Sequence, residues 1–226
     1  MNLIRILAIA ALAMVSSASA QAGLVALSNM GSDGVTYASG KFVTSTNQTS
    51  LIRSAVGFTV GASDFTVDTI SAALFGVTPP NSMSSRVAIY SNAGGSPGAS
   101  VAVSALLSTV QGDGVYTFSF TSSAGRVLTA GSTYWALIDT VGGDLAWYQH
   151  DDGIQPSDIN RTGLLTYIGD RRSLNFSDAS PTWSVRTDYR TFSISGSAAP
   201  SLVPEPALTS LLCLGGVTLI RRRMKK

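Results

Sequence analysis

The sequence is short of cysteine, glutamate, histidine and lysine. Its only cysteine is Cys213, near the C-terminus, so no disulfide can form within the preceding body and an apolar core must stabilise the fold. Glu205 is the only glutamate, and Lys41 is the only lysine before Lys225. No Gly-x-Ser-x-Gly motif is present, so the usual sequence signs of a hydrolase are missing.

Positive charge is also scarce between the two ends. Of the 15 lysines and arginines, Arg5 and five residues after position 220 lie in the terminal segments, which leaves nine. The 13 acidic residues less Glu205 leave twelve aspartates, so residues 21–199 carry a net charge of −3. Without a basic stripe along the sequence, no nucleic-acid partner is expected.

The first twenty residues have the three parts of an export signal. Arg5 supplies the positive start, 6–15 form an apolar run of about ten residues, and Ala18-Ser19-Ala20 is an Ala-x-Ala cleavage motif. The run is too short to be a transmembrane helix. We therefore predict a signal peptide at 1–20, read by the Sec translocon and signal peptidase, with cleavage after Ala20 or alternatively after Ala22.

The C-terminal segment 200–226 also has three parts. Val203-Pro204-Glu205-Pro206 is extended because each proline fixes φ and lacks an N–H. The apolar run 207–220 is fourteen residues long, which is about 21 Å as a helix against a hydrocarbon core of roughly 30 Å. Arg221, Arg222 and Arg223 then begin a basic end. We predict a short transmembrane helix that is either a weak permanent anchor or a transient one.

This layout of box, short span and arginine cluster resembles the PEP-CTERM (Pro-Glu-Pro C-terminal) sorting signal of Gram-negative bacteria that secrete exopolysaccharide. The resemblance covers residues 202–226. It implies recognition by an exosortase, a polytopic membrane enzyme thought to act as a cysteine-type transpeptidase. It also implies transient attachment to the inner membrane, followed by release to the cell surface or extracellular matrix.

The body, residues 21–199, reads as all-β. Serine, threonine, glycine and valine dominate it, and no window has a sustained 3.6-residue period. Phe65 and Val67 alternate out of phase with Ile70, which predicts a bulge near Asp68. We expect an antiparallel two-sheet sandwich with jelly-roll-like connections. The expected strands are 54–60, 65–75, 86–90, 102–110, 116–120, 133–140, 145–148, 164–168 and 189–195.

The middle of the body is similar to the choice-of-anchor R domain over about 50–197. The resemblance rests on Val87-Ala88-Ile89-Tyr90-Ser91, Gly95-Ser96-Pro97-Gly98 and Leu128-Thr129-Ala130-Gly131-Ser132-Thr133-Tyr134-Trp135. These are turn and core residues. The resemblance therefore implies a fold and an association with surface-anchoring signals, but no catalytic residues and no cofactor.

Two polar candidates lie around the only histidine. His150 could pair with Asp151 or Asp152 and a serine for hydrolysis, but an exposed loop histidine accounts for the same residues. Asp151, Asp152, Asp158 and Asn160 offer oxygen ligands for calcium, although the Asp-x-Asp-x-Asp spacing is absent and an Asp-Asp-Gly turn forms unaided. We predict neither a catalytic site nor a metal site.

Aromatic residues give the remaining candidate. Trp147, Tyr148, Tyr167 and Trp183 lie in the same half of the chain as Asp170-Arg171-Arg172. Flat rings beside polar groups are typical of sugar-binding surfaces, whereas strand-edge aromatics are also ordinary core residues. Trp135, among apolar neighbours, is expected in the core. Two functions remain open: a non-catalytic structural protein of an exopolysaccharide layer, or a carbohydrate-binding module for its glycan.

Overall fold

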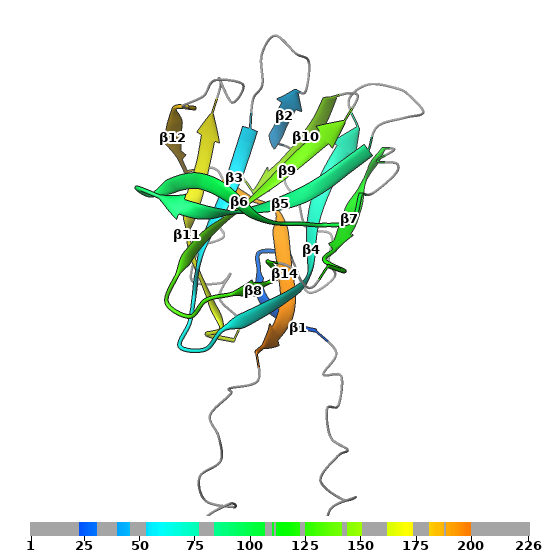
Figure 1. The fold of residues 1–226 in the computed structure, drawn as a ribbon. Helices are drawn as coiled ribbons and strands as arrows, with labels where there is room; N and C mark the ends of the chain where they lie inside the picture. The colour runs from blue at the N-terminus through cyan, green and yellow to red at the C-terminus, as the bar shows by residue number, and fades with distance from the viewer. Residues whose placement is uncertain are drawn as a thin grey trace, which may run out of the picture.

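The computed structural model describes residues 23–30, 40–45, 53–76, 84–106, 110, 112–122, 125–141, 144–150, 162–173, 181–187 and 189–199. Every regular element in these ranges is a β-strand, as the composition predicts. The strands form two antiparallel sheets that pack face to face (Figure 1). The signal peptide and the segment 200–226 lie outside the described residues.

Sheet A is organised around β4. One side of β4 pairs with β7 and β8, and the other side pairs first with β14 and then with β10. β1 extends the sheet beyond β14, and β2 extends it beyond β10. Its strands are β1 (Leu24–Ser28), β2 (Gly40–Ser45), β4 (Phe65–Gly76), β7 (Asp113–Ser119), β8 (Val127–Leu128), β10 (Asp144–His150), β13 (Tyr189–Arg190) and β14 (Phe192–Ala198).

Sheet B has the strand order β12-β11-β3-β9-β5-β6. The predicted central strand is β9, whose residues 135–140 are buried although they point alternately to the two faces. Its strands are β3 (Arg53–Val60), β5 (Ser84–Ala93), β6 (Ser96–Val103), β9 (Thr133–Val141), β11 (Leu165–Ser173) and β12 (Trp183–Arg186).

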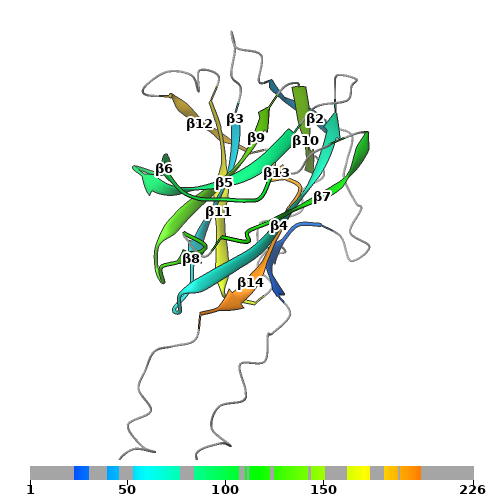
Figure 2. The same ribbon diagram turned by 45° about the vertical axis from the view of Figure 1, so that its right-hand side comes forward.

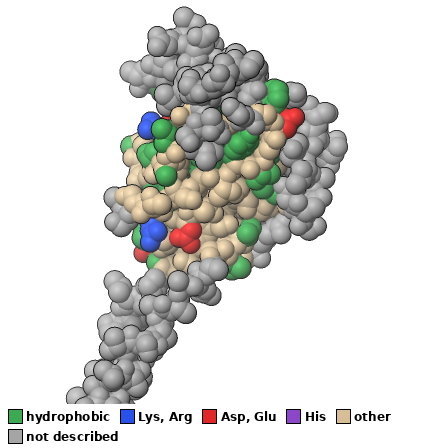
Figure 3. Space-filling model, turned by 90° about the vertical axis from the view of Figure 1, so that its right-hand side faces the viewer, with side chains coloured by type: hydrophobic (Ala, Val, Ile, Leu, Met, Phe, Trp, Pro, Cys, Tyr) green, Lys and Arg blue, Asp and Glu red, His purple; other side chains and the backbone are tan. Residues whose placement is uncertain are grey.

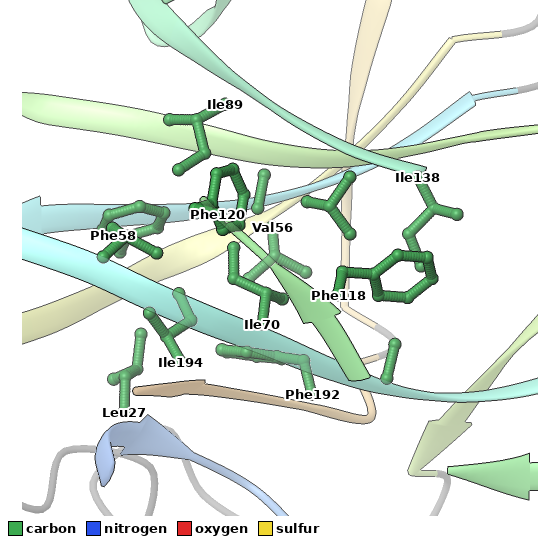
Figure 4. Packing of buried hydrophobic residues seen from close by; sticks show 14 of the residues in the cluster. Leu27, Val56, Phe58, Ile70, Ile89, Phe118, Phe120, Ile138, Phe192 and Ile194 are labelled. Atoms are coloured by element: carbon green, nitrogen blue, oxygen red, sulfur yellow. The ribbon is translucent and has the colours of Figure 1, made fainter. Parts of the chain in front are cut away.

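The core lies between the two sheets (Figure 4). Sheet B contributes alternate residues such as Val56 and Phe58, and sheet A contributes Ile70, Phe192 and Ile194. All of them are at most 1% exposed. At about 25 cal/mol per Å² of buried apolar surface, this layer supplies the main stabilisation that a body without cysteine needs.

The bulge expected near Asp68 is confirmed. In the pairing of β14 with β4, Ser195 lies opposite Thr69 and Gly196 lies opposite Val67, so Asp68 is skipped. The extra residue lets Val67 and Ile70, three positions apart, both point into the core.

The strand expected at 102–110 is wrong in its boundaries, because β6 runs from Ser96 to Val103. Pro97 and Gly98 therefore belong to a strand, and the turn before it is only Gly94-Gly95, both with positive φ. A two-residue turn of this kind matches the twist of paired strands. Pro97 is tolerated because β6 is an edge strand.

Other boundaries also differ from those predicted. The strand expected at 189–195 is divided into β13, beside β10, and β14, beside β4. The strand expected at 164–168 continues as β11 to Ser173, past a register shift at Ile168. The short or peripheral strands β1, β2, β8 and β12 were not predicted.

The two ends of the described body lie at the same end of the sandwich. β1 and β14 are antiparallel, with Leu24 opposite Gly196, so the start of one strand lies beside the end of the other (Figures 1 and 2). Asp64 accepts a hydrogen bond at its backbone oxygen from the Ala199 backbone N–H, with an N–O distance of 2.7 Å, which ties down the last described residue.

Candidate functional site

Three of the four candidate glycan-binding rings are buried. Trp147, Tyr148 and Tyr167 are 1%, 5% and 7% exposed. The Trp147 indole N–H donates to the Thr191 backbone oxygen at 2.9 Å, and the Tyr148 hydroxyl contacts the Asp113 carboxylate. Burial favours the alternative, that these three rings are core and rim residues: Trp147 and Tyr167 lie in the main core, and Tyr148 is almost covered on the other face of sheet A.

Of the polar candidates, only His150 lies among the described residues. The His150 backbone belongs to β10 and pairs with Tyr189, so it is in a strand and not in a loop. Asp151, Asp152, Asp158 and Asn160 lie outside the described residues. Within the described ranges, no group of three or more histidine, cysteine, aspartate or glutamate side chains is arranged to hold a metal ion.

A buried polar cluster lies at one end of the core. Asp170 and Arg190 are each 1% exposed. The Asp170 carboxylate accepts hydrogen bonds from the Tyr167 hydroxyl at 2.9 Å and from the Arg190 backbone N–H at 2.8 Å. The Arg190 guanidinium donates to the Ser54 hydroxyl at 3.3 Å. Because Arg190 is in sheet A and the other three are in sheet B, the cluster fixes how the sheets are aligned.

Burial raises the pKa of the Tyr167 phenol, and the negative charge and hydrogen bond of Asp170 raise it further. The folded protein therefore keeps this proton at a pH where the unfolded chain has lost it. The stability that results is complete below about pH 10, the ordinary tyrosine pKa, and is lost as the pH rises above it.

This linkage gives a measurable slope. Above pH 10, the free energy of unfolding should fall by about 1.4 kcal/mol per pH unit more in the native protein than in Tyr167→Phe. Urea denaturation between about pH 9 and 11 measures it. Tyr116→Phe is the matched control, since Tyr116 is half-buried and its hydroxyl donates to the Gly112 backbone oxygen in an exposed bond. Equal slopes in the native protein and Tyr167→Phe would contradict the linkage.

A second hydrophobic cluster lies on the outer face of sheet B, the face that points away from sheet A. Ala55, Trp135 and Leu137 are its fully buried floor, and Tyr90 and Trp183 pack against it while partly exposed. The Trp135 indole lies over Gly57, where a Cβ would come within 2.6 Å of the ring. Trp135 is therefore buried as predicted, but outside the main core.

Arg171 covers this indole from above. Its guanidinium carbon lies 5.2 Å from the Trp135 ring centroid. Its Nε donates to the Gly95 backbone oxygen, and its Nη1 donates to the Asp170 backbone oxygen, both at 3.1 Å. Because Gly95 is in the β5–β6 turn, this turn reaches across sheet B toward β11, as Figures 1 and 2 show. The Arg171 guanidinium is therefore held by three contacts.

An arginine–aspartate group continues the same face. Asp139 forms an ion pair with Arg53, and its Oδ2 lies 3.6 Å from the Nε of Arg86. Arg53 also donates to the Ile138 backbone oxygen at 3.4 Å. Burial lowers the pKa of the Arg53 guanidinium; Tyr90 raises it and Arg86 lowers it. The Arg86 side chain is 46% exposed, so it is the cation of this group that solvent reaches most easily.

Sequence reasoning missed Tyr90, Arg86 and Asp139 as members of one surface. Alternation alone places Arg86 with Tyr90, and Asp139 with Trp135. Alternation cannot predict that β9 pairs with both β3 and β5. This pairing brings these residues side by side. Only Trp183 of the four predicted rings belongs to this face.

Comparison of the chain with protein-family models and with curated protein sequences finds no match. Among the described residues, none of the elements is a helix with the length and apolar character needed to cross a membrane. On the described surface, aromatic rings and guanidinium groups lie together on the outer face of sheet B, which is therefore the candidate binding surface.

Proposed function

We propose that the protein is an exported, non-catalytic surface or extracellular-matrix protein of an exopolysaccharide-producing Gram-negative bacterium. It is sorted through a PEP-CTERM signal by an exosortase-type membrane enzyme. The observation that supports this most directly is the pairing of β1 with β14, which puts both ends of the body at one end of the sandwich.

This arrangement suits a body attached through both ends to one membrane. An export signal before Gly23 and an anchor after Ala199 would leave the sandwich at the same end, so the body can fold while both segments occupy the inner membrane. A body whose ends emerged at opposite ends would need one segment to run back along its whole length. The other parts of the proposal rest on the sequence: the signal peptide 1–20, the helix 207–220, the choice-of-anchor R resemblance and the jelly-roll-like connections.

A carbohydrate-binding module is the second candidate. The outer face of sheet B favours it, because the half-buried rings of Tyr90 and Trp183 lie near the guanidinium groups of Arg86 and Arg171. Both candidates place the protein in a glycan layer. They differ in whether the body itself holds the glycan.

Sorting predicts a mature chain that lacks its C-terminal segment. The arginines are costly to move through hydrocarbon, at roughly 2.5–3.5 kcal/mol each on insertion scales. Export should therefore stop with Glu205 at the outer face of the inner membrane. Intact-mass spectrometry of the native protein should then find a C-terminus near Pro204-Glu205-Pro206. Glu205→Ala, or neutral replacements of Arg221, Arg222 and Arg223, should leave a longer form in the inner membrane.

Ser201→Ala is the matched control, because it lies just before the box and leaves both the prolines and the glutamate in place. It should be processed as the native chain is. A mature native chain that still ends in Met224-Lys225-Lys226, in cells that contain the sorting enzyme, would contradict processing and favour a permanent anchor.

A further inference from the structure

We propose that the outer face of sheet B binds an acidic polysaccharide, with Arg86 and Arg171 pairing with its carboxylates and Tyr90 and Trp183 packing against its sugar rings. This inference rests on the proposed function, since it names the partner that a protein of a glycan layer would hold. The ligand it names is a polymer and not a single sugar, because the charged and aromatic residues are spread over several strands.

Positive charge is concentrated on sheet B although the body is acidic. The strands of sheet B carry five arginines against two aspartates, a net charge of +3, namely Arg53, Arg86, Arg171, Arg172 and Arg186 against Asp139 and Asp170. The strands of sheet A carry Lys41 and Arg190 against Asp68, Asp113 and Asp144, a net charge of −1. On the side of the molecule drawn in Figure 3, the described atoms are mostly hydrophobic side chains, other uncharged side chains and backbone, with few charged groups. An acidic ligand is therefore attracted to sheet B.

The outward charges of sheet B are few and well separated. Alternation puts Arg53, Arg86, Arg171 and Asp139 on the outer face, so this face has a net charge of +2 although Asp139 pairs with both Arg53 and Arg86. Arg86 and Arg171 come from β5 and β11, whose backbones are three strand spacings apart, or about 14 Å. Guanidinium groups suit carboxylates because they can donate two parallel hydrogen bonds.

The aromatic rings extend the surface across the sheet. Trp183 is on edge strand β12 and Tyr90 is on β5, and the backbones of these strands are four spacings apart, which is about 19 Å. Val185, 69% exposed, adds apolar surface beside Trp183. Both rings pack against the floor of Ala55, Trp135 and Leu137, so a ligand that contacts both crosses the sheet from β12 toward β5. Aromatic rings offer apolar faces against which the C–H faces of sugars can pack, with polar groups at their margins.

The face is fixed before any ligand binds. The Trp135 indole N–H donates to the Asn92 side-chain oxygen at 3.0 Å, and Arg171 is held by the Gly95 and Asp170 backbone oxygens. Little side-chain freedom is therefore left to lose at Arg171 on binding, which removes part of the usual entropy cost.

The same spacing argues against a nucleic acid. A DNA duplex carries one negative charge for about every 1.7 Å of its axis, so roughly eleven charges would lie along the 19 Å from β12 to β5. A face with a net charge of +2 cannot neutralise such a density. A glycan with carboxylates on some of its sugars matches both the sparse arginines and the apolar rings beside them.

The test uses the protein as purified from its native cells and measures its affinity for polygalacturonate. Hydroxyethyl cellulose is the neutral polymer and a DNA duplex is the alternative polyanion. We expect binding to polygalacturonate alone, weakened by added salt. Arg86→Gln should weaken it roughly fivefold, the upper range for an exposed ion pair. Trp183→Leu should weaken it about tenfold, in line with a stacking contact.

Arg126→Gln is the matched control, because Arg126 is 37% exposed, pairs loosely with Asp68 at 3.9 Å and lies outside sheet B. Its affinity should equal that of the native protein, and circular dichroism checks that each variant is folded. Equal losses in Arg126→Gln and Arg86→Gln, equal binding of the neutral polymer, tighter binding of DNA, or no binding would each overturn the inference. Failure to bind with a normally processed C-terminus leaves the sorting proposal standing, whereas an unprocessed tail with intact binding overturns sorting alone.

Discussion

Asp170→Ala is expected to lower the free energy of unfolding by about 3–5 kcal/mol, the range for a buried ionic group that loses its partner. The Asp170 carboxylate is almost completely buried and accepts hydrogen bonds from the Tyr167 hydroxyl and the Arg190 backbone N–H. Without it, both buried donors lose an acceptor, and the buried Arg190 cation loses the negative charge of its own cluster. A loss of this size is a large share of the stability of an ordinary domain.

Asp68→Ala is the matched control for this experiment. The Asp68 side chain is 36% exposed, and its nearest cation, Arg126, lies 3.9 Å away. Removing an exposed pair of this kind costs about 1 kcal/mol or less. Urea denaturation of the purified protein measures both variants. If Asp170→Ala cost no more than Asp68→Ala, the cluster would not be a unit that stabilises the fold.

Sequence patterns predicted the parts of the fold that depend on residues close to one another in the sequence. The alternation of Tyr116, Phe118 and Phe120 predicted a half-buried strand, and Phe118 and Phe120 are indeed buried. The phase change around Asp68 predicted the bulge because core-facing residues must keep to one side of a strand. The antiparallel sandwich followed from many such runs separated by turn residues.

The outer face of sheet B could not be predicted, because it depends on pairing between distant segments. Arg53, Arg86 and Asp139 are brought together only when β3, β9 and β5 lie side by side. Burial likewise depends on tertiary packing: Trp147 and Trp183 are both strand aromatics, yet one is 1% exposed and the other is partly exposed on an edge strand. The rings that sequence reasoning grouped together are therefore divided between the core, the other face of sheet A and the outer face of sheet B.

Burial of charge also could not be read from composition. The sequence favours surface positions for Asp170 and Arg190, since charged residues are almost never fully buried unless paired. Here Tyr167 and Asp170 are three residues apart on β11, and the register shift at Ile168 turns both toward the same side. In a regular strand, residues three apart point to opposite faces. The bulge in β11 is therefore what makes the buried cluster possible.

Gly125→Ala is expected to destabilise the protein by about 2–5 kcal/mol. Gly125 has a φ of 74°, a conformation that costs an alanine roughly 1–2 kcal/mol. A Cβ built there would also lie 1.8 Å from the backbone oxygen of Val101, which belongs to β6 and cannot move like a flexible side chain. Relieving such an overlap requires backbone shifts that cost about 1–3 kcal/mol more.

Gly131→Ala separates the two causes. Gly131 has nearly the same φ, 70°, but no atom lies within 4 Å of its would-be Cβ. It should therefore show only the conformational cost, and the entropy that alanine removes from the unfolded chain is the same for both variants. The difference between the two free energies of unfolding, measured by urea denaturation, reports the close approach of Gly125 to β6. Because Gly125 precedes β8 of sheet A and Val101 is in sheet B, equal losses in the two variants would mean that the sheets do not meet this closely at that edge.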